Sequence, residues 1–164
     1  MQPLFDVKFE KVFPSSLDAS RFAADATNAF WSEIGLSAGL ATQLELCIVE
    51  MVNNAYIHAY DEVENLPITV RCHFIQGTPL PELHLEIEDS GSAMTQAQLE
   101  AALANDFIEA DPNDESTWTT SGRGFLIVSS LMDRIALGKE NARNQFLMVK
   151  ELSEDDIEVL SHSI

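Results

Sequence analysis

Five short segments of the chain have the hydrophobic and polar patterning of strands. The first, VKFEKVF at residues 7–13, alternates apolar and polar residues, as expected of a strand that buries one face. PITVRCHFI and ELHLEIED follow on either side of the turn QGTPLP, and RIALGK and QFLMVKEL lie near the C-terminus. The turn residues between the members of each pair predict two hairpins.

Apolar residues recur at helical spacing in two longer segments. Residues 14–35 begin with serines that can cap a helix and end at a glycine that can stop one. The apolar positions of this first helix are Phe22, Ala26, Ala29, Phe30 and Ile34. A second helix is expected from Ser37, as its cap, to about Tyr60.

Shorter helices are predicted at TQAQLEAALAN and, after a glycine-rich start, at GRGFLIVSSLMD. Strands mixed with helices in this order predict an α+β fold, a two-layer sandwich with helices on one face of a mixed, mostly antiparallel sheet. The length of 164 residues suits one domain, which we assign to residues 1–152. Residues 153–164 are interpreted as an acidic C-terminal tail.

The net charge of the chain limits the classes of partner that it is expected to bind. Nine lysines and arginines against 27 aspartates and glutamates give a formal net charge of −18, a field that repels nucleic acid and anionic membranes. No apolar run approaches the roughly 20 residues that cross a bilayer. Cys47 and Cys72 lie in apolar stretches without metal-site spacing. These features predict a soluble, cytoplasmic protein with buried thiols and with protein partners.

The second helix carries polar residues within an apolar pattern. Glu50 and Asn54 lie one turn apart and point about the same way. An amide oxygen such as that of Asn54 is a ligand that Mg²⁺ accepts, and the Glu50 carboxylate could take a proton from an attacking hydroxyl. Taken alone, the pair is more often simply solvated. Asn53 is ambiguous, and His58 is interpreted as a packing or surface residue.

Two further motifs follow along the chain. Asp89 ends a strand just before a turn at Gly91, and its carboxylate could accept a hydrogen bond from an exocyclic amine such as that of adenine. Gly122 and Gly124 open a helix whose N–H groups could receive phosphate. Each motif alone is a common turn or helix signal. No P-loop or dinucleotide-binding fingerprint is present in the sequence.

Together and in this order, the three motifs resemble the N, G1 and G2 boxes of the GHKL (Bergerat-fold) ATPases. ELCIVEMVNNAYIHAY resembles the N box, IEDSGSAM the D-x-G-x-G box, and SGRGFLIVSSLMD the G-x-G box. The small size, the His-Ala-Tyr ending and LMDRI are most similar to the anti-sigma factor serine/threonine-protein kinases. The resemblance covers roughly residues 7–151.

The resemblance implies ATP bound between the second helix and the sheet, beneath a lid at residues 106–121. By position, Asn54 would hold Mg²⁺ and Glu50 would act as the base toward a serine of a partner. Asp89 and Gly91 would contact adenine, and Gly122 and Gly124 would approach the phosphates. The implied partners are an anti-anti-sigma protein of the STAS type, which is the substrate, and a sigma factor, which the kinase sequesters.

The sequence departs from the family pattern at three places. Ala93 replaces the second glycine of the D-x-G-x-G box, which restricts the backbone near the nucleotide. The final strand lacks the usual Gly-Thr, so a threonine contact near adenine has no obvious counterpart. The lid is acidic, and Arg123 is the first basic residue after it, which makes Arg123 a candidate phosphate contact or else a solvent-facing arginine.

These motifs lead to three hypotheses about the function of the protein. The first is an ATP-dependent protein kinase that acts as an anti-sigma factor by partner switching. The second is a nucleotide-binding module that sequesters its partner with weak or no kinase activity, which Ala93 and the acidic lid favour. The third, an interaction domain without nucleotide, requires the order of the motifs to be coincidence. The helix at residues 17–34 could add a homodimer or sigma-factor surface, although core packing explains the same pattern.

Overall fold

A computed structural model describes residues 8–75, 80–95, 97–100, 122–153 and 156. Its elements are β1 (Lys8–Pro14), α1 (Ala19–Ile34), α2 (Ala38–Asn54), the π-helical turn η2 (Ala55–Ala59), β2 (Pro67–Ile75), β3 (Glu82–Asp89), α4 (Gly122–Leu131), β4 (Arg134–Glu140) and β5 (Arg143–Glu151). Residues 97–100 are helical, and the rest of the helix expected near them lies outside the described residues.

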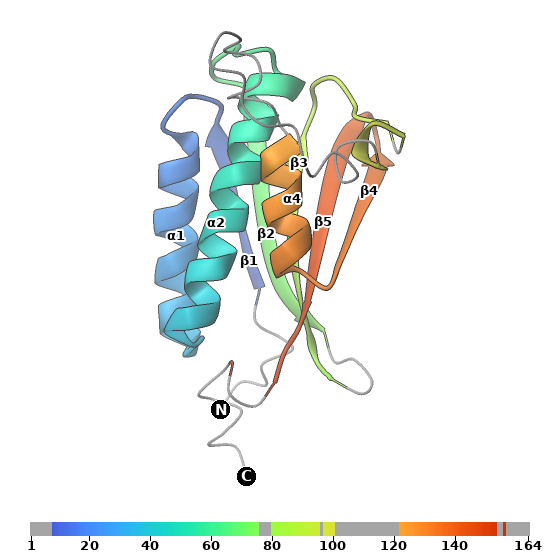
Figure 1. The fold of residues 1–164 in the computed structure, drawn as a ribbon. Coiled ribbons are helices and arrows are strands. Elements are labelled where there is room, and N and C mark those ends of the chain that lie inside the picture. The colour runs from blue at the N-terminus through green and yellow to red at the C-terminus, as the bar shows by residue number, and fades with distance from the viewer. Residues whose placement is uncertain (1–7, 76–79, 96, 101–121, 154–155, 157–164) are drawn as a thin grey trace, which may run out of the picture.

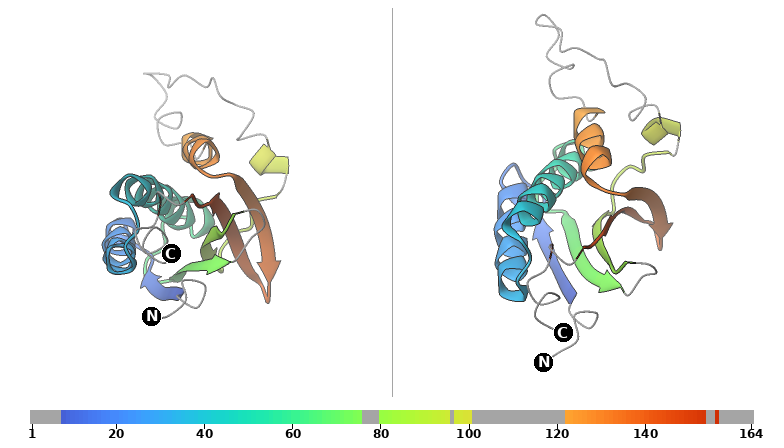
Figure 2. Two further views of the ribbon diagram at one scale, coloured as in Figure 1. Left: turned by 90° about the horizontal axis from the view of Figure 1, so that it is seen from below. Right: turned by 60° about the horizontal axis from the view of Figure 1, so that its bottom comes forward.

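The five strands form one sheet in the order β1-β2-β3-β5-β4, with α1, α2 and α4 side by side on one face (Figure 1). The views in Figure 2 show the same two layers, with the sheet strongly twisted. This confirms the α+β two-layer fold and both hairpins. All four strand pairs among the described residues are antiparallel, so the parallel component of the expected mixed sheet is not found there.

The core lies between the helices and the inner face of the sheet. Alternate residues of β2 and β3 are buried, and their aliphatic and aromatic side chains meet α2 in a single cluster. Burial of such side chains contributes roughly 1.5–3 kcal/mol each. Leu44, Ile48 and Met51 supply the α2 side of the cluster, as the helical spacing predicted. Cys47 and Cys72 are both buried free thiols, as expected.

Helix α1 buries a face that only partly overlaps the predicted one, because Ala26, Phe30 and Ile34 are partly buried against the core as expected. Its innermost residues are mostly small and include Ala23 and Thr27, together with Trp31, and none of these three is exposed to solvent. Phe22 is instead 50% exposed, and Ala29 is exposed too, so their assignment to a core face was wrong. The spacing of apolar residues did not predict this exposure, because small residues let α1 pack closely against its neighbours and the larger Phe22 then lies outside.

The N-termini of the two long helices differ in how they are capped. The Ser37 hydroxyl accepts a hydrogen bond from the Leu40 N–H at 3.3 Å, so Ser37 caps α2 as predicted. The residue before α1 is Asp18, which makes no side-chain capping bond, so the serine cap expected there is not found. Ser15 is instead fully buried and joins the β1–α1 connection to Val63 and Leu66.

No helix among the described residues is long and apolar enough to cross a membrane. Of the predicted C-terminal tail, Ser153 and Asp156 are described. The carbonyl oxygen of Asp156 accepts a hydrogen bond from the Ser37 N–H at 2.7 Å, which ties this part of the chain to the start of α2. The boundary proposed between residues 152 and 153 stays a prediction.

Candidate nucleotide site

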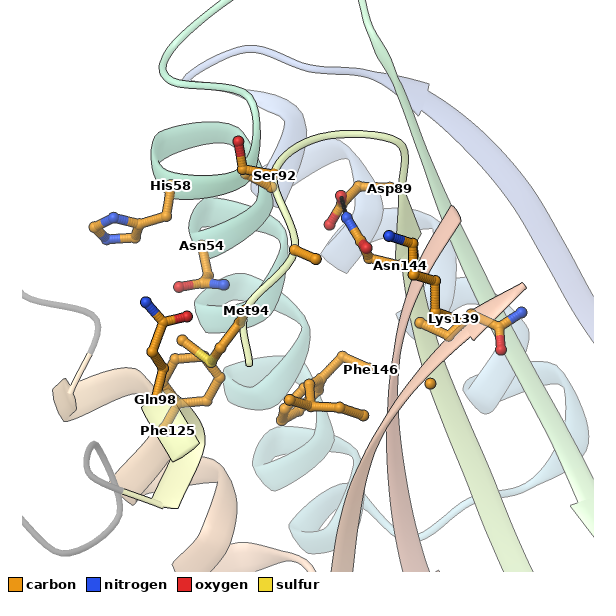
Figure 3. Close-up of a pocket in the computed structure, with 15 residues that line it drawn as sticks. Asn54, His58, Asp89, Ser92, Met94, Gln98, Phe125, Lys139, Asn144 and Phe146 are labelled. Atoms are coloured by element: carbon orange, nitrogen blue, oxygen red, sulfur yellow. Dashed lines mark hydrogen bonds between the residues drawn. The ribbon is translucent and has the colours of Figure 1, made fainter. Parts of the chain in front are cut away.

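A cavity of about 660 Å³ opens between the end of α2, the segment after β3, the start of α4 and the β4–β5 hairpin. Apolar side chains line part of it, namely Met94, Phe125, Leu137 and Phe146. Polar and ionisable groups line the remainder, including Asn54, His58, Asp89, Gln98, Lys139 and Asn144 (Figure 3). An apolar cleft with a few convergent polar groups suits a small organic ligand that carries charge.

Asn54 occupies the last position of α2 and faces this cavity (Figure 3). Its side-chain oxygen is buried, and it has no hydrogen-bond partner among the described residues. A buried polar atom without a partner costs about 1–3 kcal/mol, so such an atom calls for an explanation. A cation or a ligand donor that enters the cavity would satisfy it.

Glu50 lies one turn before Asn54 on α2 and does not line the cavity itself. Burial raises the pKa of the Glu50 carboxyl above its ordinary value, a shift that would suit a proton acceptor near neutral pH. Gly124, at the start of α4, packs directly against this carboxylate. A Cβ added at Gly124 would lie 3.0 Å from Glu50 Oε2 and 3.5 Å from Met51 Cε.

We therefore expect Gly124→Ala to displace the Glu50 carboxylate while leaving the fold intact. The added methyl meets the end of a flexible side chain, and alanine is the better helix former by about 1 kcal/mol, so the free energy of unfolding should change by less than that. Any activity that depends on Glu50 should fall by about tenfold or more. Gly39→Ala is the matched control because a Cβ there meets nothing within 4 Å.

Asp89 is the last residue of β3, and it faces the cavity from the side opposite Asn54 (Figure 3). Its Oδ1 accepts hydrogen bonds from the Gly91 N–H and from the Asn144 amide, each at 2.9 Å. Burial raises the pKa of the Asp89 carboxyl, and these two hydrogen bonds partly offset the effect. The carboxylate is thus fixed in orientation, and Oδ2 has no hydrogen-bond partner among the described residues.

The segment after Asp89 is packed against the end of the second helix. The Ser92 N–H donates to the Ala59 carbonyl oxygen at 2.8 Å, and a Cβ at Gly91 would overlap the Ala59 backbone. The π-helical turn η2 brings Ala59 to this position. The Tyr60 hydroxyl accepts from the Ser90 N–H at 2.8 Å and donates to the Pro67 carbonyl oxygen at 2.5 Å. The first two motifs therefore form one connected unit.

The other predicted site residues are placed as follows. Ala93 is exposed and lines the cavity, so its methyl group stands at the site as anticipated. Gly122 begins α4, and Gly124 is buried within it. The side chain of Arg123 and the lid at residues 106–121 lie outside the described parts of the chain, so their roles stay predictions.

Sequence reasoning missed several cavity residues. Asn144 is the second residue of β5 and precedes the segment QFLMVKEL that was predicted as a strand, and it pairs in register with Asp89. His58 is exposed and lines the cavity one turn beyond Asn54, a position that the helical spacing could have indicated. Lys139 also lines it, from β4. Nothing in the sequence indicates that β5 lies beside β3.

The donor set fits Mg²⁺ held together with phosphate. Among the described residues, no group of three or more His, Cys, Asp or Glu side chains could hold a metal ion by itself. Mg²⁺ is commonly bound by one or two protein oxygens together with substrate phosphates and water. The unpaired oxygen of Asn54 is one such donor, and the fit rests on it.

Residues 13–150 match the histidine kinase-like ATPase domain family, and because this match spans most of the chain, the protein belongs to that family. The resemblance inferred from the three motifs is confirmed at this level. Among curated proteins, the chain is 25% identical over 148 residues to an anti-sigma F factor of Clostridium acetobutylicum, covering 90% of this chain and 95% of that protein.

It is also 25% identical over 149 residues to an anti-sigma F factor of Pasteuria penetrans, covering 88% of this chain and 91% of that protein. One similar solved structure is a chain of the SiaB-SiaC complex from Pseudomonas aeruginosa. That chain has 13% sequence identity and a TM-score of 0.47, with 87% of this chain and 89% of that chain covered.

Proposed function

We propose that the protein is an ATP-dependent serine/threonine-protein kinase that acts as an anti-sigma factor. The observation that carries this proposal is the buried, unpaired oxygen of Asn54, which faces the cavity one helical turn after the Glu50 carboxylate. The similarity to two anti-sigma F factors supports the choice of partners. The substrate would be an anti-anti-sigma protein of the STAS type, and the sequestered partner a sigma factor.

In this proposal, different residues of the cavity bind different parts of ATP. Asp89 accepts a hydrogen bond from the exocyclic amine of adenine, and the apolar lining from Phe125 and Phe146 packs near the base. Asn54 would hold Mg²⁺ at the phosphate end of the cavity, and a bound cation there would supply charge neutralisation to the phosphates. Among the described residues that line the cavity, the basic side chains are those of His58 and Lys139.

Glu50 then acts on the attacking group. Its carboxylate accepts the proton of a partner's serine hydroxyl while the serine oxygen bonds to the γ-phosphorus and the bond to the β-phosphate oxygen breaks, releasing ADP. The raised pKa of Glu50, caused by burial, suits this proton transfer. Packing against Gly124 restrains the carboxylate before the partner arrives.

A second candidate is a nucleotide-binding module that sequesters its partner without efficient transfer. Ala93 at the cavity and the acidic residues Asp106, Glu109, Asp111, Asp114 and Glu115 of the lid sequence favour it. Incubation of the protein and its co-purifying partner with ATP labelled at the γ-phosphate separates the two functions. A kinase labels the partner on serine or threonine, whereas the module binds ATP and leaves the partner unlabelled.

A further inference from the structure

Asn144 connects two parts of the cavity wall through a single amide group. Its Nδ2 donates to Asp89 Oδ1 and to the Gly91 carbonyl oxygen, each at 2.9 Å. Both partners are acceptors, so the orientation of the amide is fixed by its surroundings and both of its N–H bonds are used. Asn144 also lines the cavity beside Asp89 (Figure 3).

The backbone of Asn144 is well placed to hold this geometry. It pairs with Asp89 in the β3–β5 ladder and with Lys139 in the β4–β5 ladder, so strands flank it on both sides. A residue on a strand that is paired on both sides positions a neighbouring group more firmly than a loop residue can. Asp89 is the last residue of β3, beside the turn at Gly91, and its carboxylate gains this support from Asn144.

We propose that Asn144 is a positioning residue that sets the selectivity of the site for a purine bearing an exocyclic amine. By occupying Oδ1 of Asp89, it turns Oδ2 toward the cavity as the acceptor for that amine. Its second hydrogen bond holds the Gly91 backbone, so the acceptor and the adjoining wall keep a fixed separation. The inference rests on the proposed nucleotide function and adds the residue that selects the base.

A purely structural role for Asn144 predicts a different outcome. If the amide only held the β4–β5 hairpin in place, its loss would weaken every ligand of the cavity by the same factor. If it orients Asp89 toward an amine, its loss weakens amine-bearing ligands alone. The ratio of two affinities therefore separates the roles where a single affinity does not.

The experiment compares ATP with purine riboside 5′-triphosphate, which lacks the exocyclic amine, by calorimetric titration of the full chain with Mg²⁺. The wild type should bind ATP about tenfold more tightly, the value of one hydrogen bond to a charged group. In Asn144→Ala this preference should fall to about twofold or less. Asn28→Ala, on α1 and away from the cavity lining, is the control that should keep the wild-type preference.

Asn144→Leu approximates the side-chain shape and has no group that can donate to Asp89, so it replaces the alanine variant if that variant does not fold by circular dichroism. It too should lose the preference. An unchanged preference in either folded variant overturns the inference, as does equal binding of the two ligands by the wild type; in both cases the nucleotide site itself stands. Failure of the wild type to bind either ligand overturns the proposed function as well.

Discussion

Replacement of Glu50 by alanine or glutamine is expected to lower phosphate transfer to the partner by about 10²- to 10⁴-fold, the usual contribution of a general base. Binding of ATP should stay within about twofold of the wild type, because Glu50 does not line the cavity. Glutamine preserves the shape of the side chain and removes its basicity. The measurement is single-turnover transfer at saturating ATP.

The pH dependence gives a second readout of the same role. A base acts in its ionised form, so transfer by the wild type should rise with pH through the pKa of Glu50, which burial raises above its ordinary value. That rise should be absent from any residual transfer by Glu50→Gln. Glu33→Gln, at an exposed position of α1, serves as the charge-matched control and should behave as wild type. Full transfer by either Glu50 variant would refute the assigned role.

Replacement of Gly91 by alanine should damage both the fold and the site. The new Cβ would overlap the carbonyl group of Ala59, and backbone on both sides leaves neither partner free to yield. We expect the free energy of unfolding to fall by about 1–3 kcal/mol, as in overpacked cores. Denaturant unfolding measures this change, with Gly39→Ala as the control in open space.

Binding of ATP by the folded fraction of Gly91→Ala should weaken by about tenfold or more, because the segment that carries Asp89 must move away from η2. The hydrogen bond from Ser92 to Ala59 would be strained by the same movement. If Gly91→Ala keeps both the stability and the ATP affinity of the wild type, the segment after Asp89 is not held against η2 as described.

Local patterns predicted the helices and strands well and the packing of α1 only in part. The alternation in β2 and β3 and the stripe of Leu44, Ile48 and Met51 follow directly from strand and helix periods, and the structure shows both. For α1, the helical period predicted the helix and only part of its inner face, because Ala26, Phe30 and Ile34 pack against the core whereas Phe22 is exposed. Close packing of Ala23 and Thr27 decided which face turned inward, and that depends on neighbours remote in sequence.

In the candidate site too, some features were predicted from local sequence and others depend on tertiary structure. The relation between Glu50 and Asn54 depends on one helix, so the sequence predicted it. The pairing of Asn144 with Asp89 depends on the strand order β3-β5-β4, which no local signal specifies. The π-helical turn before Tyr60, which places Ala59 against Gly91, was likewise not predicted by any local pattern.

Calorimetric titration with ATP, in the presence and absence of Mg²⁺, shows whether the cavity binds ATP together with Mg²⁺ through Asn54. The wild type should bind ATP more tightly by about tenfold or more when Mg²⁺ is present. Asn54→Ala should lose this dependence on Mg²⁺, whereas Asn53→Ala, at the adjacent position outside the cavity lining, should keep it. Absence of ATP binding by the wild type with Mg²⁺ present would overturn the proposed nucleotide site, and an unchanged Mg²⁺ dependence in Asn54→Ala would overturn the proposed role of Asn54.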